Sequence, residues 1–344
     1  MNVVGLSLAT PLGLSAAATQ RACAAGISRA EVLEQVPRRP TAVRLATLPE
    51  LLNREDRMLA LVGHNVQALM AALPAGHEAK IRCHLAVPAS GPTFARDRWL
   101  AGLLRVAGLA RLEVHRDRCV EAGRVGFFQA LRDAYAGITD VRGPAYAVVG
   151  AVDSLVDPAS LASLAEAGLL LDGHNPDGVI PGEAAGFVVL ANTAAVAGRR
   201  AEVQARLAAL AFARDPVPAD ERTPYAAVGL TAVFRELRGH PAVGDRRVDR
   251  VLTCQPGASF WAHEFAAAYL RTAGMMPEPL DHRGLAGSLG DVGCAAGVCQ
   301  LALALHAFAP APWRHVAALR RIVVYAAAEH DCAGCLLVHP KEAA

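Results

Sequence analysis

The chain has 344 residues, 53% of them hydrophobic and 19% charged, and its net charge is +2 from 34 basic and 32 acidic side chains. This balance argues against nucleic acid as a partner, and the eight scattered cysteines favour reduced thiols in the cytoplasm over disulfides. The longest apolar stretch, residues 292–312, is interrupted by Gln300 and His306, so we expect no membrane span. The apolar start lacks the basic region that a secretory signal needs.

The first part of the chain alternates short apolar runs with helical patterns. A β-branched run at residues 2–7 stops at a Thr-Pro-Leu-Gly turn, and an Ala-rich helical stretch follows to about Ala25. Residues 146–150 are apolar enough for a parallel strand that is buried on both faces. The other expected elements are strands at 81–87, 112–115, 182–190 and 203–212, and helices at 97–109 and 123–136. This order predicts βα units.

The polar, Pro-rich residues 214–224 give the clearest domain boundary. After it the same order returns, with helices expected at 226–238, 260–273 and 295–308, and strands at 248–253, 322–327 and 335–339. Two halves with one plan, 1–213 and 214–344, suggest an internal duplication that rests on element order alone.

Several motifs resemble the β-ketoacyl synthases of the thiolase-like superfamily. The most specific is DGVIPGEAAG at 177–186, which is similar to the DGFxPGEGAG segment of that family; AVVGAVDS at 147–154 resembles its strand that leads into a Gly-Gly loop. The opening residues 4–13 resemble its first strand and turn. The resemblance covers nearly the whole chain and implies an α/β class fold of five layers, α/β/α/β/α, made of two related halves.

The resemblance also locates the positions of the family's Cys-His-His catalytic residues. The family's GHxxAAxG loop resembles GDVGCAAG at 290–297, with Asp291 in the histidine position. The family's strand that ends in HGTGT resembles VDRVLTCQPG at 248–257, with Cys254 in the other histidine position. The nucleophile is expected at a strand-to-helix elbow, where a helix N-terminus lowers a thiol pKa. Counting back from the following helix puts Glu121 or Val120 there; Cys119 lies one or two positions early.

Those replacements disfavour decarboxylative condensation, which needs an acyl nucleophile and two neutral hydrogen-bond donors. Glu121 cannot hold a stable thioester, Cys254 is a weak donor, and an ionised Asp291 repels an enolate. The resemblance therefore implies a non-condensing protein of fatty acid or polyketide-type biosynthesis. It would bind an acyl thioester or acyl carrier protein, as a homodimer or paired with an active ketosynthase through an edge strand.

Other interpretations of the same residues stay open at this point. The alternative function is acyl transfer or condensation by Cys119 or Cys254, with His263 or His330 as the base; His330 lies where the family carries a glycine-rich closing loop. Glu121 is also a plausible first-turn acid, and Asp291 a helix cap for residues 295–308. Cys332-x-x-Cys335, preceded by His330, could bind zinc with Cys294 and Cys299. The second pair is separated by four residues across an expected helix start, and the first runs into a buried strand, so we expect core cysteines, no metal and no cofactor.

Overall fold

The structure is a computed structural model that describes residues 1–33, 41–44, 53–74, 79–197, 202–216, 226–308, 319–328 and 331–340. Its strands form a ten-stranded sheet in the order β10-β9-β11-β12-β8-β1-β7-β6-β4-β5, and a small two-stranded sheet pairs β2 (Glu31–Leu33) with β3 (Thr41–Val43). The large sheet consists of two five-stranded halves, which meet where β1 pairs with β8 over only two residue pairs.

The first half contains β1 (Asn2–Ala9), β7 (Glu183–Ala191), β6 (Tyr146–Ser154), β4 (Ile81–Ala86) and β5 (Leu112–Val120). Strand β4 is parallel to both β5 and β6, whereas β7 is antiparallel to β6 and β1. Strands β6 and β7 are buried along their whole length, as expected for strands that are covered on both faces.

The second half repeats this pattern with β8 (Ala205–Arg214), β12 (Asp331–Val338), β11 (Arg321–Ala327), β9 (Arg250–Thr253) and β10 (His282–Gly284). Here β9 is parallel to β10 and β11, and β12 is antiparallel to β11 and β8. The common topology agrees with the expected pair of related halves. The boundary expected after residue 213 falls at the end of β8, which pairs with β12 along most of its length.

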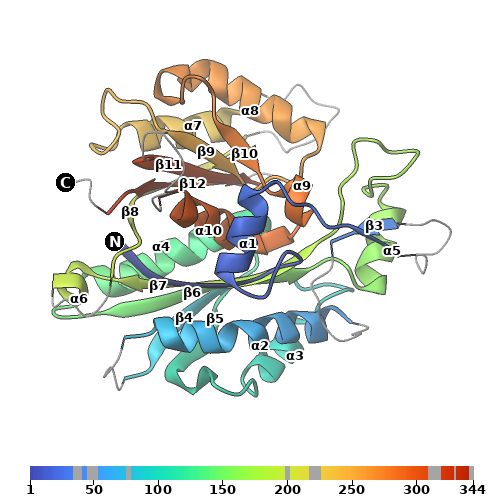
Figure 1. Cartoon of the computed structure of the whole chain (residues 1–344), viewed down its shortest axis with the longest axis horizontal. Helices are drawn as coiled ribbons and strands as arrows, with labels where there is room; N and C mark the ends of the chain where they lie inside the picture. The colour runs from blue at the N-terminus through green and yellow to red at the C-terminus, as the bar shows by residue number, and fades with distance from the viewer. Residues whose placement is uncertain are drawn as a thin grey trace.

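Helices and sheet halves alternate in five layers (Figure 1). Helices α2 (Arg54–Ala72) and α3 (Arg96–Leu103) cover the outer face of the first half, and α7 (Val228–Arg238) and α8 (Ser259–Thr272) cover that of the second. Helices α4 (Gly126–Thr139) and α10 (Ala296–Phe308) lie between the halves in the largest apolar core. The expected five-layered α/β/α/β/α class is therefore confirmed.

The remaining helices are short or peripheral: α1 (Ala16–Ala24), α5 (Pro158–Glu166), α6 (Thr193–Ala197) and α9 (Ala286–Leu289), with 3-10 turns at Leu109–Arg111, Gly123–Val125, Ala273–Met275 and Gly293–Ala295. Within the described part of the chain, no helix is both long and apolar enough to cross a lipid bilayer.

The two main departures from the sequence-based elements both concern the elbow before α4. Strand β5 continues to Val120 instead of ending near residue 115, and α4 begins at Gly126 after the 3-10 turn Gly123–Val125. The polar run 115–118 hides the strand in the sequence because β5 is an edge strand with one partner, β4, and exposes these side chains to solvent.

Candidate functional site

The first component of the site is Arg124, which lies in the 3-10 turn between β5 and α4. Gly123 supplies the left-handed backbone conformation (φ +52°) that starts this turn. The Arg124 guanidinium forms an ion pair with the Asp291 carboxylate, 167 positions further along the chain. The side chains of Arg124 and Asp291 are 20% and 8% exposed, so the pair is shielded from water and joins the two halves.

Asp291, the second component, is held in place by the motif that carries the family resemblance. Its backbone N–H donates to the Ile180 carbonyl at 2.7 Å, and its own carbonyl accepts from the Gly182 N–H at 2.8 Å. Its Oδ1 accepts from the Gly293 N–H at 2.9 Å. One carboxylate thus accepts a hydrogen bond from Gly293, the first residue of the 3-10 turn before α10, and also pairs with Arg124.

The backbone beside Asp291 is fixed by Asp153 at the end of β6. The Asp153 carboxylate accepts from the Cys294 N–H at 3.0 Å and pairs with Arg54 at 2.7 Å. A Cβ atom at Gly293, whose φ is +53°, would lie 1.9 Å from Asp153 Oδ2. Glycine is therefore required here both by backbone conformation and by space.

A second buried ion pair supports the same region from α2. Arg57 donates two hydrogen bonds to Glu183, at 2.8 and 2.6 Å, and the Ser154 hydroxyl donates to the same carboxylate at 2.9 Å. Glu183 is fully buried. The Glu of the PGE motif therefore has a structural partner on α2 and is not available for chemistry.

Cys254, the third component, follows β9 and is 4% exposed. Its N–H donates to the Tyr325 carbonyl at 2.9 Å, and its side chain lies in the central core with Cys299 and Cys335. Burial raises the pKa of the Cys254 thiol well above its usual value, although the charge of Arg124 acts in the opposite direction. The thiol is therefore protonated at neutral pH.

Glu121 has different neighbours from those expected of a nucleophile position. Its carboxylate pairs with Arg96 at the start of α3 and accepts from the Ser90 N–H at 2.8 Å. Arg124, which precedes α4 in the 3-10 turn, contacts the Asp291 carboxylate instead. The sequence count did not point to Arg124 because the 3-10 turn separates the strand from α4 by more residues than expected.

The other candidate residues are not brought to this site by the contacts described. Cys119 is half-buried in β5, and burial raises its pKa to about 11. His263 is exposed on α8. His330 lies outside the described residues. Cys332 and Cys335 are buried in β12 and face different cores, and no cluster of three or more metal-ligating side chains occurs within the described ranges.

All eight cysteines of the sequence are in the described part, and burial raises the pKa of every one of their thiols. Cys23 is raised to about 11 and Cys335 to about 12. A reactive cysteine needs a lowered pKa and access to its substrate. None of the eight has this environment.

No family model and no curated protein matches the sequence, but solved structures do. The ishigamide ketosynthase/chain length factor is 16% identical with a TM-score of 0.74 and covers 98% of both chains. The module 6 ketosynthase of the Bacillus subtilis 168 bacillaene synthase is 13% identical, with a TM-score of 0.73 over 99% of this chain and 72% of that one. A third similar structure is AntDE:AntF, a type II polyketide acyl-carrier protein in complex with its ketosynthase. It is 14% identical with a TM-score of 0.72, and the match covers 98% of both chains.

Because these sequence identities are low, the likeness establishes the fold alone. The chain has the thiolase-like fold of the ketosynthases, as the DGVIPGEAAG segment indicates.

Proposed function

We propose that this protein is a non-condensing ketosynthase-like protein that binds an acyl chain or an acyl carrier protein and works beside an active ketosynthase. The observation that carries the proposal is the Arg124–Asp291 ion pair. The pair supports the proposal if Arg124 and Asp291 occupy two of the family's catalytic positions, because a condensing enzyme needs a nucleophile at one and a neutral donor at the other.

The chemistry of this pair opposes the condensation reaction at both steps. The guanidinium is always protonated and cannot form a thioester. An ionised carboxylate near the reacting carbon would repel the carbanion that decarboxylation generates. A binding role needs neither group to react, and the pair stabilises the junction between the two halves instead.

The environment of the thiols argues against the alternative, acyl transfer by Cys119 or Cys254. Both pKa values are raised by burial, so little thiolate forms at neutral pH. No described base contacts either sulfur; the Cys119 Sγ lies 3.7 Å from the His115 carbonyl oxygen.

The edge strand β5 supports the expected association with a second chain. Only its β4 side is paired within the described residues, and a free strand edge offers backbone groups to a partner. Among the similar structures, one is a ketosynthase paired with a chain length factor, and another is a ketosynthase in complex with its acyl-carrier protein.

The direct test is intact-protein mass spectrometry after incubation with acyl- and malonyl-acyl carrier protein. We expect no covalent adduct and no elongation by the protein alone, but saturable binding of the acyl carrier protein or acyl thioester. An adduct that is lost in Cys119→Ala or Cys254→Ala would overturn the proposal in favour of acyl transfer. Absence of any binding would overturn the proposed ligand class.

A pair of matched variants tests the location of the elbow. In Arg124→Cys/Asp291→Asn the new thiol lies at the N-terminus of α4 without a facing carboxylate, so we expect faster alkylation by iodoacetamide than in the parent protein. Glu121→Cys is the control at the position that the sequence favours. Faster reaction of the Glu121→Cys thiol would show that the elbow has been assigned to the wrong residue.

A further inference from the structure

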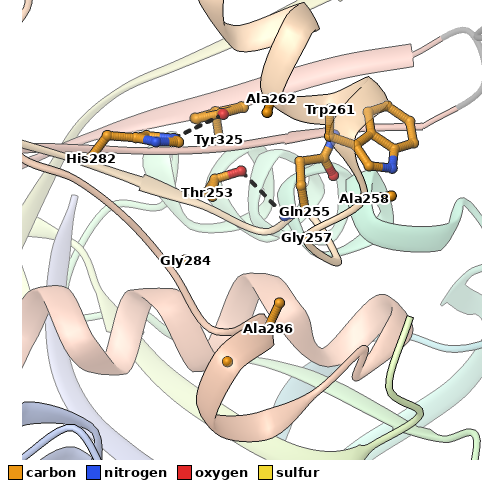
Figure 2. Close-up of a pocket in the computed structure, with 11 residues that line it drawn as sticks. Thr253, Gln255, Gly257, Ala258, Trp261, Ala262, His282, Gly284, Ala286 and Tyr325 are labelled. Carbon is orange, nitrogen blue, oxygen red and sulfur yellow. Dashed lines mark hydrogen bonds between the residues drawn. The ribbon is translucent and has the colours of Figure 1, made fainter. Parts of the chain in front are cut away.

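A cavity of about 260 Å³ lies in the second half, where it is lined by residues of β9, β10, β11, α8 and α9 and the segments beside them. Successive residues of β9 point to opposite faces of the sheet: Leu252 and Cys254 belong to the central core, whereas Thr253 borders the cavity between the sheet, α8 and α9. Figure 2 shows this arrangement, with Trp261 and Ala262 on α8 and Ala286 on α9. The cavity therefore lies on the side of β9 that faces away from the Cys254 side chain.

The position of the cavity is one at which α/β proteins bind ligands. Thr253 and Gly284 are the last residues of the parallel strands β9 and β10, and both line it. Ligands of open α/β sheets bind outside the carboxyl ends of parallel strands. Among the strands that the structure describes, β10 is the last in the order at this edge of the sheet.

The lining contains hydrogen-bonding groups but no charged side chain. Burial lowers the pKa of His282 to about 4, so the ring is neutral at pH 7, and burial raises the pKa of Tyr325 well above its usual value. His282 Nε2 and Tyr325 Oη share a hydrogen bond of 3.1 Å (Figure 2). An ionic ligand would lose its hydration here without a counter-charge, so the cavity favours an uncharged one.

One lining residue has an acceptor that no described residue satisfies. Gln255 is 5% exposed, and its Oε1 is buried without a hydrogen-bond partner among the residues that the structure describes. Its backbone N–H donates to Thr253 Oγ1 at 3.2 Å, which fixes the residue beside the cavity (Figure 2). A buried acceptor without a donor is destabilising. A ligand with an O–H or N–H group would supply the missing donor after a rotation of the Gln255 side chain that turns Oε1 into the cavity.

The remaining walls suit a flat apolar body. Trp261 borders the cavity, and so does the His282 ring, which stacks on Phe265 at 3.8 Å with an interplanar angle of 6°. Small residues complete the lining, and a Cβ placed on Gly287 would meet no atom within 4 Å. The volume is below that of sites for drug-sized ligands, which start at roughly 300 Å³.

We propose that this cavity binds a small uncharged aromatic molecule with a hydroxyl group, a ligand of the phenol class. Its O–H donates to Gln255 Oε1, and its ring packs between Trp261 and His282. The proposal does not depend on the proposed function, because it concerns the opposite face of the second half of the sheet.

The test uses three probes with the full chain: phenol, which has the donor; anisole, which lacks it; and benzoate, which is charged. Ligand-observed NMR titration at pH 7 should give saturable phenol binding with a Kd on the order of 1 mM, the range open to so small a ligand. Anisole should bind about tenfold more weakly or worse. Benzoate should not compete with phenol.

Two test variants and one control variant separate this site from non-specific binding. Gly287→Leu fills the open space and should abolish phenol binding, whereas Gly63→Leu, at an exposed α2 position where an added Cβ also meets nothing within 4 Å, should bind like the parent protein. Gln255→Met removes the acceptor but keeps the bulk, so phenol and anisole should bind within about twofold of each other.

Circular dichroism and thermal unfolding confirm that each variant is folded before it is titrated. The proposal is wrong if phenol binding does not saturate below about 10 mM, if Gly287→Leu binds as well as Gly63→Leu, or if anisole matches phenol in the parent protein. A preference for phenol that persists unchanged in Gln255→Met would exclude Gln255 as the acceptor.

Discussion

Breaking the Arg124–Asp291 pair should destabilise the protein, and a double-mutant cycle measures how strongly the two residues are coupled. Arg124→Met leaves a carboxylate that is only 8% exposed without its counter-charge. Loss of one partner of a fully buried pair costs about 3–5 kcal/mol. Because the Arg124 side chain is 20% exposed, we expect the lower end, about 2–3 kcal/mol.

Asp291→Asn should cost less, about 1–2 kcal/mol, because the amide oxygen still accepts from the Gly293 N–H and the guanidinium reaches some water. In the double variant neither charge is left unpaired, so its loss should be smaller than the sum of the two single losses. We expect a coupling of about 1–3 kcal/mol.

The measurement is urea unfolding followed by circular dichroism for the parent, both single variants and the double variant. The matched control is the surface pair Arg29–Glu31, whose side chains are 58% and 44% exposed; the corresponding cycle should give a coupling of about 0.5 kcal/mol or less. If the effects of Arg124→Met and Asp291→Asn add within about 0.5 kcal/mol, the pair does not join the two halves and the reasoning fails.

Three further changes test other parts of the structure. Gly293→Ala should lower the free energy of unfolding by about 2 kcal/mol or more, since its Cβ would lie 1.9 Å from Asp153 Oδ2. An unchanged free energy of unfolding in urea would contradict this close contact. Glu183→Gln should lower the free energy of unfolding by about 3 kcal/mol, because Glu183 is fully buried in its ion pair. A loss of stability below about 1 kcal/mol in the same assay would argue against a strong buried ion pair. The folded-state pKa of His282 is lowered to about 4 from 6.5, so the stability that the neutral ring contributes is present above pH 6.5 and is lost as pH falls toward 4. The parent protein should therefore lose more stability than His282→Phe between pH 7 and pH 5. Equal losses in the two proteins would contradict the lowered pKa.

The fold could largely be predicted from the sequence because most of its signals are local. The apolar run of residues 146–150 and the helical pattern of 295–308 form β6 and α10 with small shifts in their bounds. The PGE motif also lies where its resemblance implies, at the start of β7. Periodicity and motif spacing carry this information because each strand or helix buries its own face.

The sequence did not reveal elements that are very short or that expose much of their length to solvent. The three-residue β10 has no hydrophobic periodicity, and its exposed Arg283 and Gly284 resemble a loop. Strand β5 continues through the polar residues His115 and Arg118, which an edge strand tolerates. The error at β5 shifted the expected elbow toward Glu121.

The sequence by itself indicated the thiolase-like fold, because its motifs need no three-dimensional information to be read; the replacement of the Cys-His-His residues, with Asp291 and Cys254 at two of the positions, stays a prediction from those motifs. Only the tertiary structure decided that Arg124 faces Asp291, since these residues are 167 positions apart and meet through the packing of two halves. Burial of the thiols likewise depends on layers that form only after the sheet has assembled. Local pattern fixes residue type and element, whereas long-range packing fixes which side chains share a site and in which state of charge.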